Sequence, residues 1–389
     1  MPYLLAQIVF GLLAMTICLP SMQQWGDIFS TSASRVQLTF SAFVVAYGVS
    51  QLLYGPLSDR YGRRPVVLVG LAIAIAGSVA AVLAHSIDGL VMARLVQGLG
   101  CGATMVVGRS LVQDYFAGPE RTRVMAIIGM TMGVCPPTAT VLGGQLHVHL
   151  GWQANPALVA GLGMLLFVFA VRMLPRGTRA MAADAHWVVG MLRAYGTLAR
   201  VRIYRWHVVI LGSSTGAFYT YLAAAPLVLR GYGIGPDGVG VHVMTATLSY
   251  VVGNYMTSRL IGRLGDRRLM ITGQAITAVS IVLMLGLSGW NSALAFSAPA
   301  LVLGIGHGFL MPPTLSGTVG AMPALAGAAA AAAGLIQQLS GALGGYAVGF
   351  VSTEGSLHSA LLLGLFTLTG LIGQWGVERA RRGAGGSVS

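Results

Sequence analysis

Two ionisable side chains, Arg94 and His307, lie deep inside long apolar stretches of the sequence. An arginine in such a stretch requires a partner or a water-filled cavity, and Arg94 can bind an anionic group or tune a neighbour because a guanidinium stays protonated. Alternatively, Arg94 extends toward the membrane surface. A histidine changes its charge between about pH 5 and pH 8, so His307 is a candidate proton carrier. A hydrogen-bonded packing residue is the commoner role for a lone buried histidine.

A segment with several ionisable side chains directly follows an apolar stretch. Its residues are Gly55-Pro-Leu-Ser-Asp59-Arg60-Tyr-Gly62-Arg63-Arg64-Pro. The two glycines allow a tight turn and a close approach to a neighbouring helix, and Asp59 can pair with an arginine or with a helix N-terminus. A shorter version, Gly262-Arg-Leu-Gly-Asp266-Arg267, lies in the second half of the chain. Both segments are candidates for charged contacts at one surface of the molecule.

The composition indicates that membrane-spanning helices carry these residues. The 389 residues are 55% hydrophobic and 8% charged, whereas about 25% of a soluble globular chain is charged. Apolar stretches of about 18 residues or more, which can cross the hydrocarbon core as helices, recur along the chain. We therefore predict an all-α polytopic membrane protein with about twelve transmembrane helices. The expected spans are 4–22, 36–56, 66–84, 89–111, 123–146, 155–174, 206–229, 237–258, 270–289, 293–316, 323–350 and 357–376.

The distribution of positive charge predicts the orientation of the chain. All 23 basic residues are arginines, and most of them fall on one side of the membrane if the N-terminus is cytoplasmic, as the positive-inside rule requires. We expect both termini in the cytoplasm, with the first segment retained as a helix and not removed as a signal peptide. The net charge of +13 then needs no nucleic-acid partner.

The chain divides into two similar halves at its longest polar interval. We expect an N-terminal half at 1–174, a cytoplasmic linker at 175–205, a C-terminal half at 206–378 and a cytoplasmic tail at 379–389. Gly98-Leu-Gly100-Cys-Gly102 in the fourth span matches Gly304-Ile-Gly306-His-Gly308 in the tenth, and the segments of Asp59 and Asp266 pair in the same order. Such a repeat indicates two six-helix halves around a central site to which access alternates.

The segment from Gly55 to Arg64 resembles the signature loop of the major facilitator superfamily. Arg94-Leu-Val-Gln97 is similar to the motif that places an arginine in the fourth helix of that superfamily. Within the superfamily the chain resembles the bicyclomycin and chloramphenicol (Bcr/CflA) type of multidrug exporter. The residues that carry this resemblance are Val36-Gln37-Leu38-Thr39, Gln51-Leu-Leu-Tyr54-Gly55-Pro56, Arg109-Ser-Leu-Val-Gln-Asp114 and Tyr219-Thr-Tyr221-Leu-Ala-Ala-Ala-Pro226.

This resemblance implies a secondary active transporter of the bacterial inner membrane that exports small drug-like compounds in exchange for protons. It also implies that Arg63 and Asp114 join Asp59 in a charge cluster at a cytoplasmic gate. If the second half has an equivalent gate, Asp266 and Arg267 belong to it.

The fifth span resembles the antiporter motif of proton-coupled exporters. It contains Pro136, Pro137, Gly143 and Gly144, although Ala139-Thr140 stands where the motif has Gly-Pro or Ala-Pro. We expect a kinked and closely packed helix there.

One departure from the resemblance bears on proton coupling. The related exporters have an aspartate in the first span where this chain has Thr16. His307 would then carry the proton, or a carboxylate nearer the surface such as Asp27 or Asp114 would do so. Alternatively, the substrate itself carries the driving charge.

Polar and aromatic residues of the predicted spans are expected to line a central substrate cavity. They are Gln37, Tyr47, Arg94, Gln97, Tyr219, Tyr221, Asn254, His307, Gln337 and Gln338. Tyr219 and Tyr221 could equally be packing residues at helix interfaces. The expected partners are a small-molecule substrate, a proton as coupling ion and the lipid bilayer, and we expect a monomer.

Other functional classes fit the sequence less well. The alternative within transport is an exporter or importer of one metabolite, such as an amino-acid or sugar derivative. A transport-dead membrane sensor is a third possibility, which the intact charged loop disfavours. Gly212-Ser-Ser214-Thr-Gly216 matches a hydrolase motif but lies in an apolar span, so we expect no enzyme. His147 and His149 are poorly spaced for a metal, and we expect neither a metal nor a cofactor.

Overall fold

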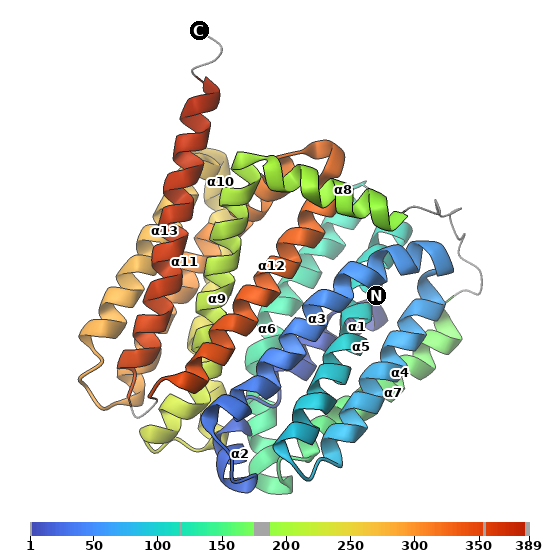
Figure 1. Cartoon of the computed structure of the whole chain (residues 1–389), viewed down its shortest axis with the longest axis vertical. Helices are drawn as coiled ribbons and strands as arrows, with labels where there is room; N and C mark the ends of the chain where they lie inside the picture. The colour runs from blue at the N-terminus through green and yellow to red at the C-terminus, as the bar shows by residue number, and fades with distance from the viewer. Residues whose placement is uncertain (1, 117, 175–186, 353–354, 386–389) are drawn as a thin grey trace. The chain divides into compact units, whose positions relative to one another are not determined.

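The computed structural model describes residues 2–116, 118–174, 187–352 and 355–385, and it confirms the all-α fold. Within these ranges the regular elements are helices alone (Figure 1). The α-helices are α1 (Pro2–Thr16), α2 (Met22–Ile28), α3 (Ala33–Tyr61), α4 (Arg63–Val82), α5 (Ile87–Tyr115), α6 (Gly118–Leu150), α7 (Ala154–Met173), α8 (Trp187–Arg200), α9 (Arg202–Gly231), α10 (Pro236–Gly286), α11 (Ala293–Gly320), α12 (Ala326–Ala347) and α13 (Leu357–Gly385). Residues 175–186 of the predicted linker 175–205 lie outside the described residues.

Eight of the described helices are long and apolar enough to cross a membrane, namely α3, α4, α5, α7, α9, α10, α11 and α13. Helix α10 comprises two spans, because Gly265 has a non-helical backbone with φ 73° and ψ 163°. Helices α1, α6 and α12 are also apolar. Counting α10 twice, these helices give the twelve spans that the sequence predicts.

The predicted first span, 4–22, is wrong at its C-terminal end. Helix α1 ends at Thr16, and the short helix α2 begins at Met22. Pro20 has no N–H to donate to the carbonyl of Thr16, and the N–H of Leu19 takes that carbonyl in a tighter turn at 3.1 Å. An apolar run alone does not reveal such a break, because the residues on both sides of it are buried.

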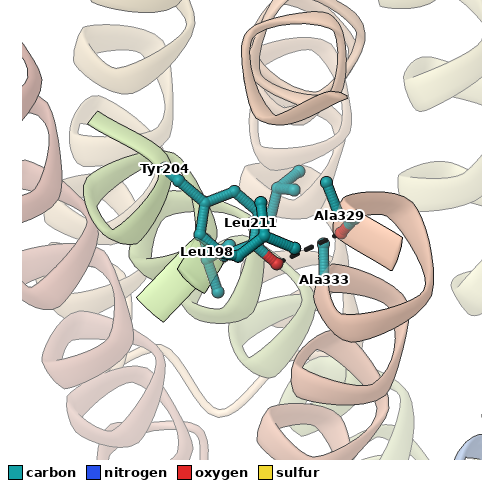
Figure 2. Packing of buried hydrophobic residues seen from close by; sticks show 6 residues of the cluster. Leu198, Tyr204, Leu211, Ala329 and Ala333 are labelled. Carbon is teal, nitrogen blue, oxygen red and sulfur yellow. Dashed lines mark hydrogen bonds between the residues drawn. The ribbon is translucent and has the colours of Figure 1, made fainter. Parts of the chain in front are cut away.

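Helix α8 lies within the predicted linker and was not expected as an element. Leu198 of α8 packs with Tyr204 and Leu211 of α9 and with Ala329 and Ala333 of α12 (Figure 2). The Tyr204 hydroxyl donates a hydrogen bond to the carbonyl oxygen of Ala329 at 3.1 Å. The C-terminal part of the predicted linker is therefore packed against helices and is not a free connection.

The described chain groups into two compact units by its internal contacts. The first unit comprises 1–183 and 225–244, and the second comprises 184–224 and 245–389. Helices α9 and α10 therefore each contribute residues to both units. The division into halves at 174 and 206 stays a prediction, and each unit is described by itself below.

In the first unit, α5 packs along both α3 and α4, α4 packs along α7, and α1 packs against α5 and α6 (Figure 1). Glycines permit the close approach of these helices. A Cβ atom at Gly98 would collide with the backbone of Phe43 in α3, and one at Gly100 would collide with the backbone of Gly70 and Ala74 in α4. Small residues at such crossings allow the backbones themselves to touch.

The second unit repeats this pattern with the matching glycines of α11. A Cβ atom at Gly304 would collide with the backbone of Ala246, and one at Gly306 would collide with the backbone of Gly273 and Thr277, all in α10. The similarity between the fourth and tenth spans therefore corresponds to equivalent packing. By this equivalence His307 occupies the position that Cys101 has in the first unit.

The charged segments of the two units pair differently from the predicted register. Gly62, between α3 and α4, has φ 91° and ψ 155°, and Gly265, between the two spans of α10, has φ 73° and ψ 163°. Because a positive φ favours glycine, these two residues are the equivalent turns. Asp266 then corresponds to Arg63, and Gly262 corresponds to Asp59. The recurrence of Gly, Asp and Arg in the sequence had instead paired Asp266 with Asp59. Residue types alone do not show which glycine has the positive φ.

Candidate functional site

Arg63 forms an ion-pair cluster at the arginine-rich end of the first unit, which is the end that carries Arg60, Arg63 and Arg64. Its Nε lies 3.0 Å from Asp114 Oδ2, and its Nη1 contacts the Asp59 carboxylate and donates to Ser58 Oγ at 2.6 Å. The Arg63 side chain is 17% exposed, whereas Asp59 and Asp114 are 57% and 42% exposed. The cluster joins the C-terminal ends of α3 and α5 to the start of α4. These are the three residues that the resemblance brings together.

The neighbouring arginines of this segment make other contacts. Arg64 Nη2 donates to the carbonyl oxygen of Val171 in α7 at 2.7 Å. The Arg60 guanidinium lies 5.4 Å from the centre of the Tyr61 ring. Gly55 is loosely packed, since a Cβ atom there would make ordinary contact with Val106.

In the second unit the equivalent end is held by Arg267, whose Nε lies 2.7 Å from Glu378 Oε2 in α13. The carboxylate of Glu378 also accepts from Gln374 Nε2 at 3.4 Å. Among the described residues Asp266 is exposed and is not in an ion pair. Glu378 was not among the predicted site residues. Its position near the end of the last span is a signal that could have found it.

Arg94 of α5 forms the most deeply buried charged site in the described part of the first unit. Its side chain is 2% exposed. Nη1 donates to the carbonyl oxygen of Ala14 at 2.8 Å and to Gln97 Oε1 at 2.5 Å, and Nη2 donates to the carbonyl oxygen of Met15 at 3.3 Å. The guanidinium lies 4.4 Å from the centre of the Phe43 ring. Arg94 therefore points inward and does not extend to the surface.

Three other predicted residues of the first unit, Gln97, Tyr47 and Gln37, are buried as well. Gln97 Nε2 donates to Ser78 Oγ of α4 at 2.7 Å. Tyr47 is buried and stacks on Phe43 with ring centres 6.0 Å apart. Gln37 is fully buried nearer the N-terminal end of α3. Phe43 and Ser78 were not predicted, because the sequence alone does not show that Phe43 contacts Arg94 or that Ser78 contacts Gln97.

In the second unit, the predicted residues fall into two groups. His307 is buried in α11, and its ring meets Phe218 of α9 edge to face with centres 6.3 Å apart. Asn254 donates to the carbonyl oxygen of Tyr250 at 3.0 Å, and the Tyr250 ring lies 6.4 Å from Phe218. The rings of His307 and Tyr250 therefore both border Phe218, and Asn254 binds the backbone of Tyr250.

The second group links α9 and α12. The Tyr219 hydroxyl donates to Gln338 Oε1 at 3.2 Å, and Gln337 Nε2 donates to Thr215 Oγ1 at 3.1 Å. Tyr221 stands apart, because it is fully buried and stacks on Phe296 at 5.1 Å. The hydrogen bond of the Tyr219 hydroxyl agrees with a polar role for Tyr219.

Helix α6 carries the antiporter-like segment, and its glycines lie at close contacts within the first unit. A Cβ atom at Gly143 would collide with the carbonyl oxygen of Ile17, and one at Gly144 would collide with the backbone of Pro236. The carbonyl oxygen of Gly143 accepts from Asn155 Nδ2 at 3.1 Å. Pro136 and Pro137 lie inside the helix, and the Pro136 carbonyl accepts from Thr140 Oγ1 at 2.7 Å.

A pocket of about 360 Å³ lies at the opposite end of the first unit. It is lined by Gln23, Gln24, Asp27, Ile28, Arg230, Gly233, Ile234, Gly235 and Pro236. Gln23 Nε2 donates to the carbonyl oxygens of Pro226 at 2.7 Å and Ile234 at 3.2 Å, and Arg230 pairs with Asp27 at 2.6 Å. The sequence does not reveal this group of contacts, because the partners are far apart along the chain.

Comparison with known proteins agrees with this architecture. The Major Facilitator Superfamily matches residues 4–345 and 207–383. The chain is 29% identical to the chloramphenicol resistance protein of Pseudomonas aeruginosa, over 76% of this chain and 70% of that protein. It is 27% identical to multidrug resistance protein D of Escherichia coli, over 94% of this chain and 91% of that protein.

Solved structures show the same fold. A D-xylose-proton symporter has a TM-score of 0.74 at 14% identity and covers 97% of this chain and 94% of its own. A mutant of the nucleoside transporter NupG also has a TM-score of 0.74 at 13% identity, covering 97% of this chain and 98% of its own. The chain is thus a multi-pass membrane transporter that belongs to the Major Facilitator Superfamily.

Proposed function

We propose that this transporter exports small drug-like compounds from a bacterial cell by alternating access. The relatives named for chloramphenicol and multidrug resistance support this proposal, and they match most of the chain. The observation that carries it is the buried Arg94 with Gln97 and Phe43, because a charged group inside an apolar bundle marks a substrate or ion pathway. The groups around His307 and Tyr219 supply aromatic and amide contacts suited to such compounds.

The proposal places both termini in the cytoplasm of the inner membrane. In this orientation the ends with Arg63 and Arg267 face the cytoplasm, as the positive-inside rule requires. The ion pairs of Arg63 with Asp59 and Asp114 would then close the cytoplasmic side in part of the transport cycle. Proton exchange is the proposed driving force.

Drug susceptibility of a pump-deficient bacterial host tests the proposal. Cells that express the chain should tolerate several-fold more of at least one compound in a panel of neutral, anionic and cationic drugs. The tolerance should fall when a proton uncoupler is added. Expression of Arg94→Gln at the same membrane abundance is the control. Equal susceptibility of expressing and empty cells to the whole panel would refute drug export.

A further inference from the structure

We propose that Arg94 binds an anionic group of the substrate, so that the chain selects organic anions over neutral compounds and cations. This inference rests on the proposed transport function and narrows its substrate class. It follows from the charge balance around one buried side chain.

The groups that hold Arg94 are all neutral. Two are the backbone carbonyls of Ala14 and Met15, one is the amide oxygen of Gln97, and one is the ring of Phe43. These acceptors satisfy the Nη atoms, but they leave the positive charge uncompensated. The buried Nε has no hydrogen-bond partner. A buried guanidinium in this state gains strongly from a carboxylate or another anion.

No carboxylate supplies that charge within the described residues. Arg94 takes part in none of their ion pairs, and no described aspartate or glutamate is buried. Among the described residues, the positive charge of Arg94 is therefore not used by an internal salt bridge.

Thr16 explains why the charge is open in this chain. It follows directly after the two residues whose carbonyls bind Arg94, and it is fully buried. Its hydroxyl donates to the carbonyl oxygen of Leu12 at 2.9 Å, inside its own helix. A carboxylate at this position would sit beside the guanidinium and neutralise it. With a threonine there, a cationic substrate meets repulsion and an anionic substrate meets attraction.

Anion export also has an electrical driving force. A membrane potential that is negative inside favours outward movement of a negative charge, by roughly 50-fold in equilibrium concentration ratio for each 100 mV. The membrane potential would then act on the charge of the substrate, in addition to the proposed proton exchange. A buried carboxylate for proton coupling is not required for such transport.

Arg94 could instead be only a structural tie between α5 and the end of α1, and the experiment separates these roles. The purified full chain is titrated with three compounds that share one ring system, naphthoate, methyl naphthoate and naphthylmethylammonium. We expect naphthoate alone to bind and to raise Tm. Arg94→Lys should keep this preference, and Arg94→Gln should bind naphthoate roughly 10- to 150-fold more weakly, the loss that corresponds to one charge-assisted hydrogen bond.

Thr16 provides a test that leaves the arginine in place. Thr16→Asp should abolish naphthoate binding because the new carboxylate occupies the guanidinium, whereas the uncharged Thr16→Asn should retain it. A folded Thr16→Asp protein that binds naphthoate as the parent does would overturn the inference, even if Arg94→Gln fails to fold. Equal binding of the three compounds, or no binding of naphthoate by the parent, would also overturn it.

Vesicles containing the reconstituted parent then separate this inference from the proposed function. With an imposed potassium diffusion potential, naphthoate should accumulate on the positive side, and the accumulation should need no pH gradient. Preferential movement of methyl naphthoate would overturn anion selectivity while leaving transport intact. Arg94-dependent naphthoate transport without any drug tolerance in cells would refute drug export while supporting the anion site.

Discussion

Arg63 is the residue at which the ends of three helices are joined, through Asp59 of α3 and Asp114 of α5. Both carboxylates are more than one-third exposed, and exposed ion pairs contribute only about 0–1 kcal/mol to stability. Such pairs do not decide whether the chain folds. They can decide how readily the helix ends separate during transport, so their effect is expected in the transport rate.

We expect Asp59→Asn to insert normally and to lose most of its transport activity. The substitution keeps the shape of the side chain and removes the charge that pairs with Arg63. Membrane abundance by immunoblot and efflux of a tolerated drug are the two measurements. Asp88→Asn is a matched control, since Asp88 also forms an exposed pair with an arginine of α3, Arg35, near the opposite end of the helices. Full efflux by Asp59→Asn would remove the gate role.

In the second unit we expect Glu378→Gln to impair transport and Asp266→Asn to have little effect. Arg267 pairs with Glu378, which is 17% exposed, and Asp266 stands at the position equivalent to Arg63. The same efflux assay compares the two variants at equal abundance. A stronger defect in Asp266→Asn than in Glu378→Gln would contradict the register derived from Gly62 and Gly265.

The site residues differ in how far the sequence could predict them. Arg63 and Asp114 were predicted because a family motif fixes their types and positions. Arg94 was predicted because an arginine is conspicuous in an apolar stretch. Glu378 and Gln23 were not, because their roles depend on partners that only the tertiary structure places beside them. The same reason explains why the letters around Asp266 suggested the wrong register.

At the scale of elements, glycine contacts determine how closely the helices pack in both units. Gly100→Ala should destabilise the protein by about 1–3 kcal/mol, because the added Cβ meets the backbone of α4 and the two helices must separate. Gly334→Ala in α12 is the control, since a Cβ there meets nothing within 4 Å. Thermal unfolding of the purified proteins in detergent measures both. A Tm for Gly100→Ala at or above that of Gly334→Ala would contradict the packing argument.

The elements themselves could be predicted wherever one long apolar run forms one helix, as for α3, α7 and α11. The prediction failed where local chemistry interrupts or adds a helix. Pro20 separates α1 from α2 inside one apolar run. Helix α8 has 14 residues, too few for a membrane span, and its packing through Leu198 depends on α9 and α12.

At the scale of the whole molecule, α9 and α10 connect the two units within single helices. Residues 225–244 pack with the first unit, while the preceding part of α9 and the following part of α10 pack with the second. Pro226 lies in α9 close to this border and cannot donate a backbone hydrogen bond to Leu222. If access alternates by rocking, either the 225–244 segment leaves its neighbours in the first unit or these helices bend near the border.

A crosslink between Asp27 and Arg230 should therefore stop transport. These residues form an exposed ion pair next to the hydrogen bonds that Gln23 donates to the carbonyl oxygens of Pro226 and Ile234. All of these contacts hold α2 against the 225–244 segment. We expect the double variant Asp27→Cys with Arg230→Cys to transport until a cleavable thiol crosslinker joins the two side chains, and to recover when the linker is reduced. Cys18, Cys101 and Cys135 are buried, so the reagent should reach the introduced thiols preferentially. The two single variants treated with the same reagent are the controls.

Undiminished transport by the crosslinked protein would mean that α2 and the 225–244 segment stay together throughout the cycle. The opening movement would then have to come from bending of α9 and α10 beyond that segment.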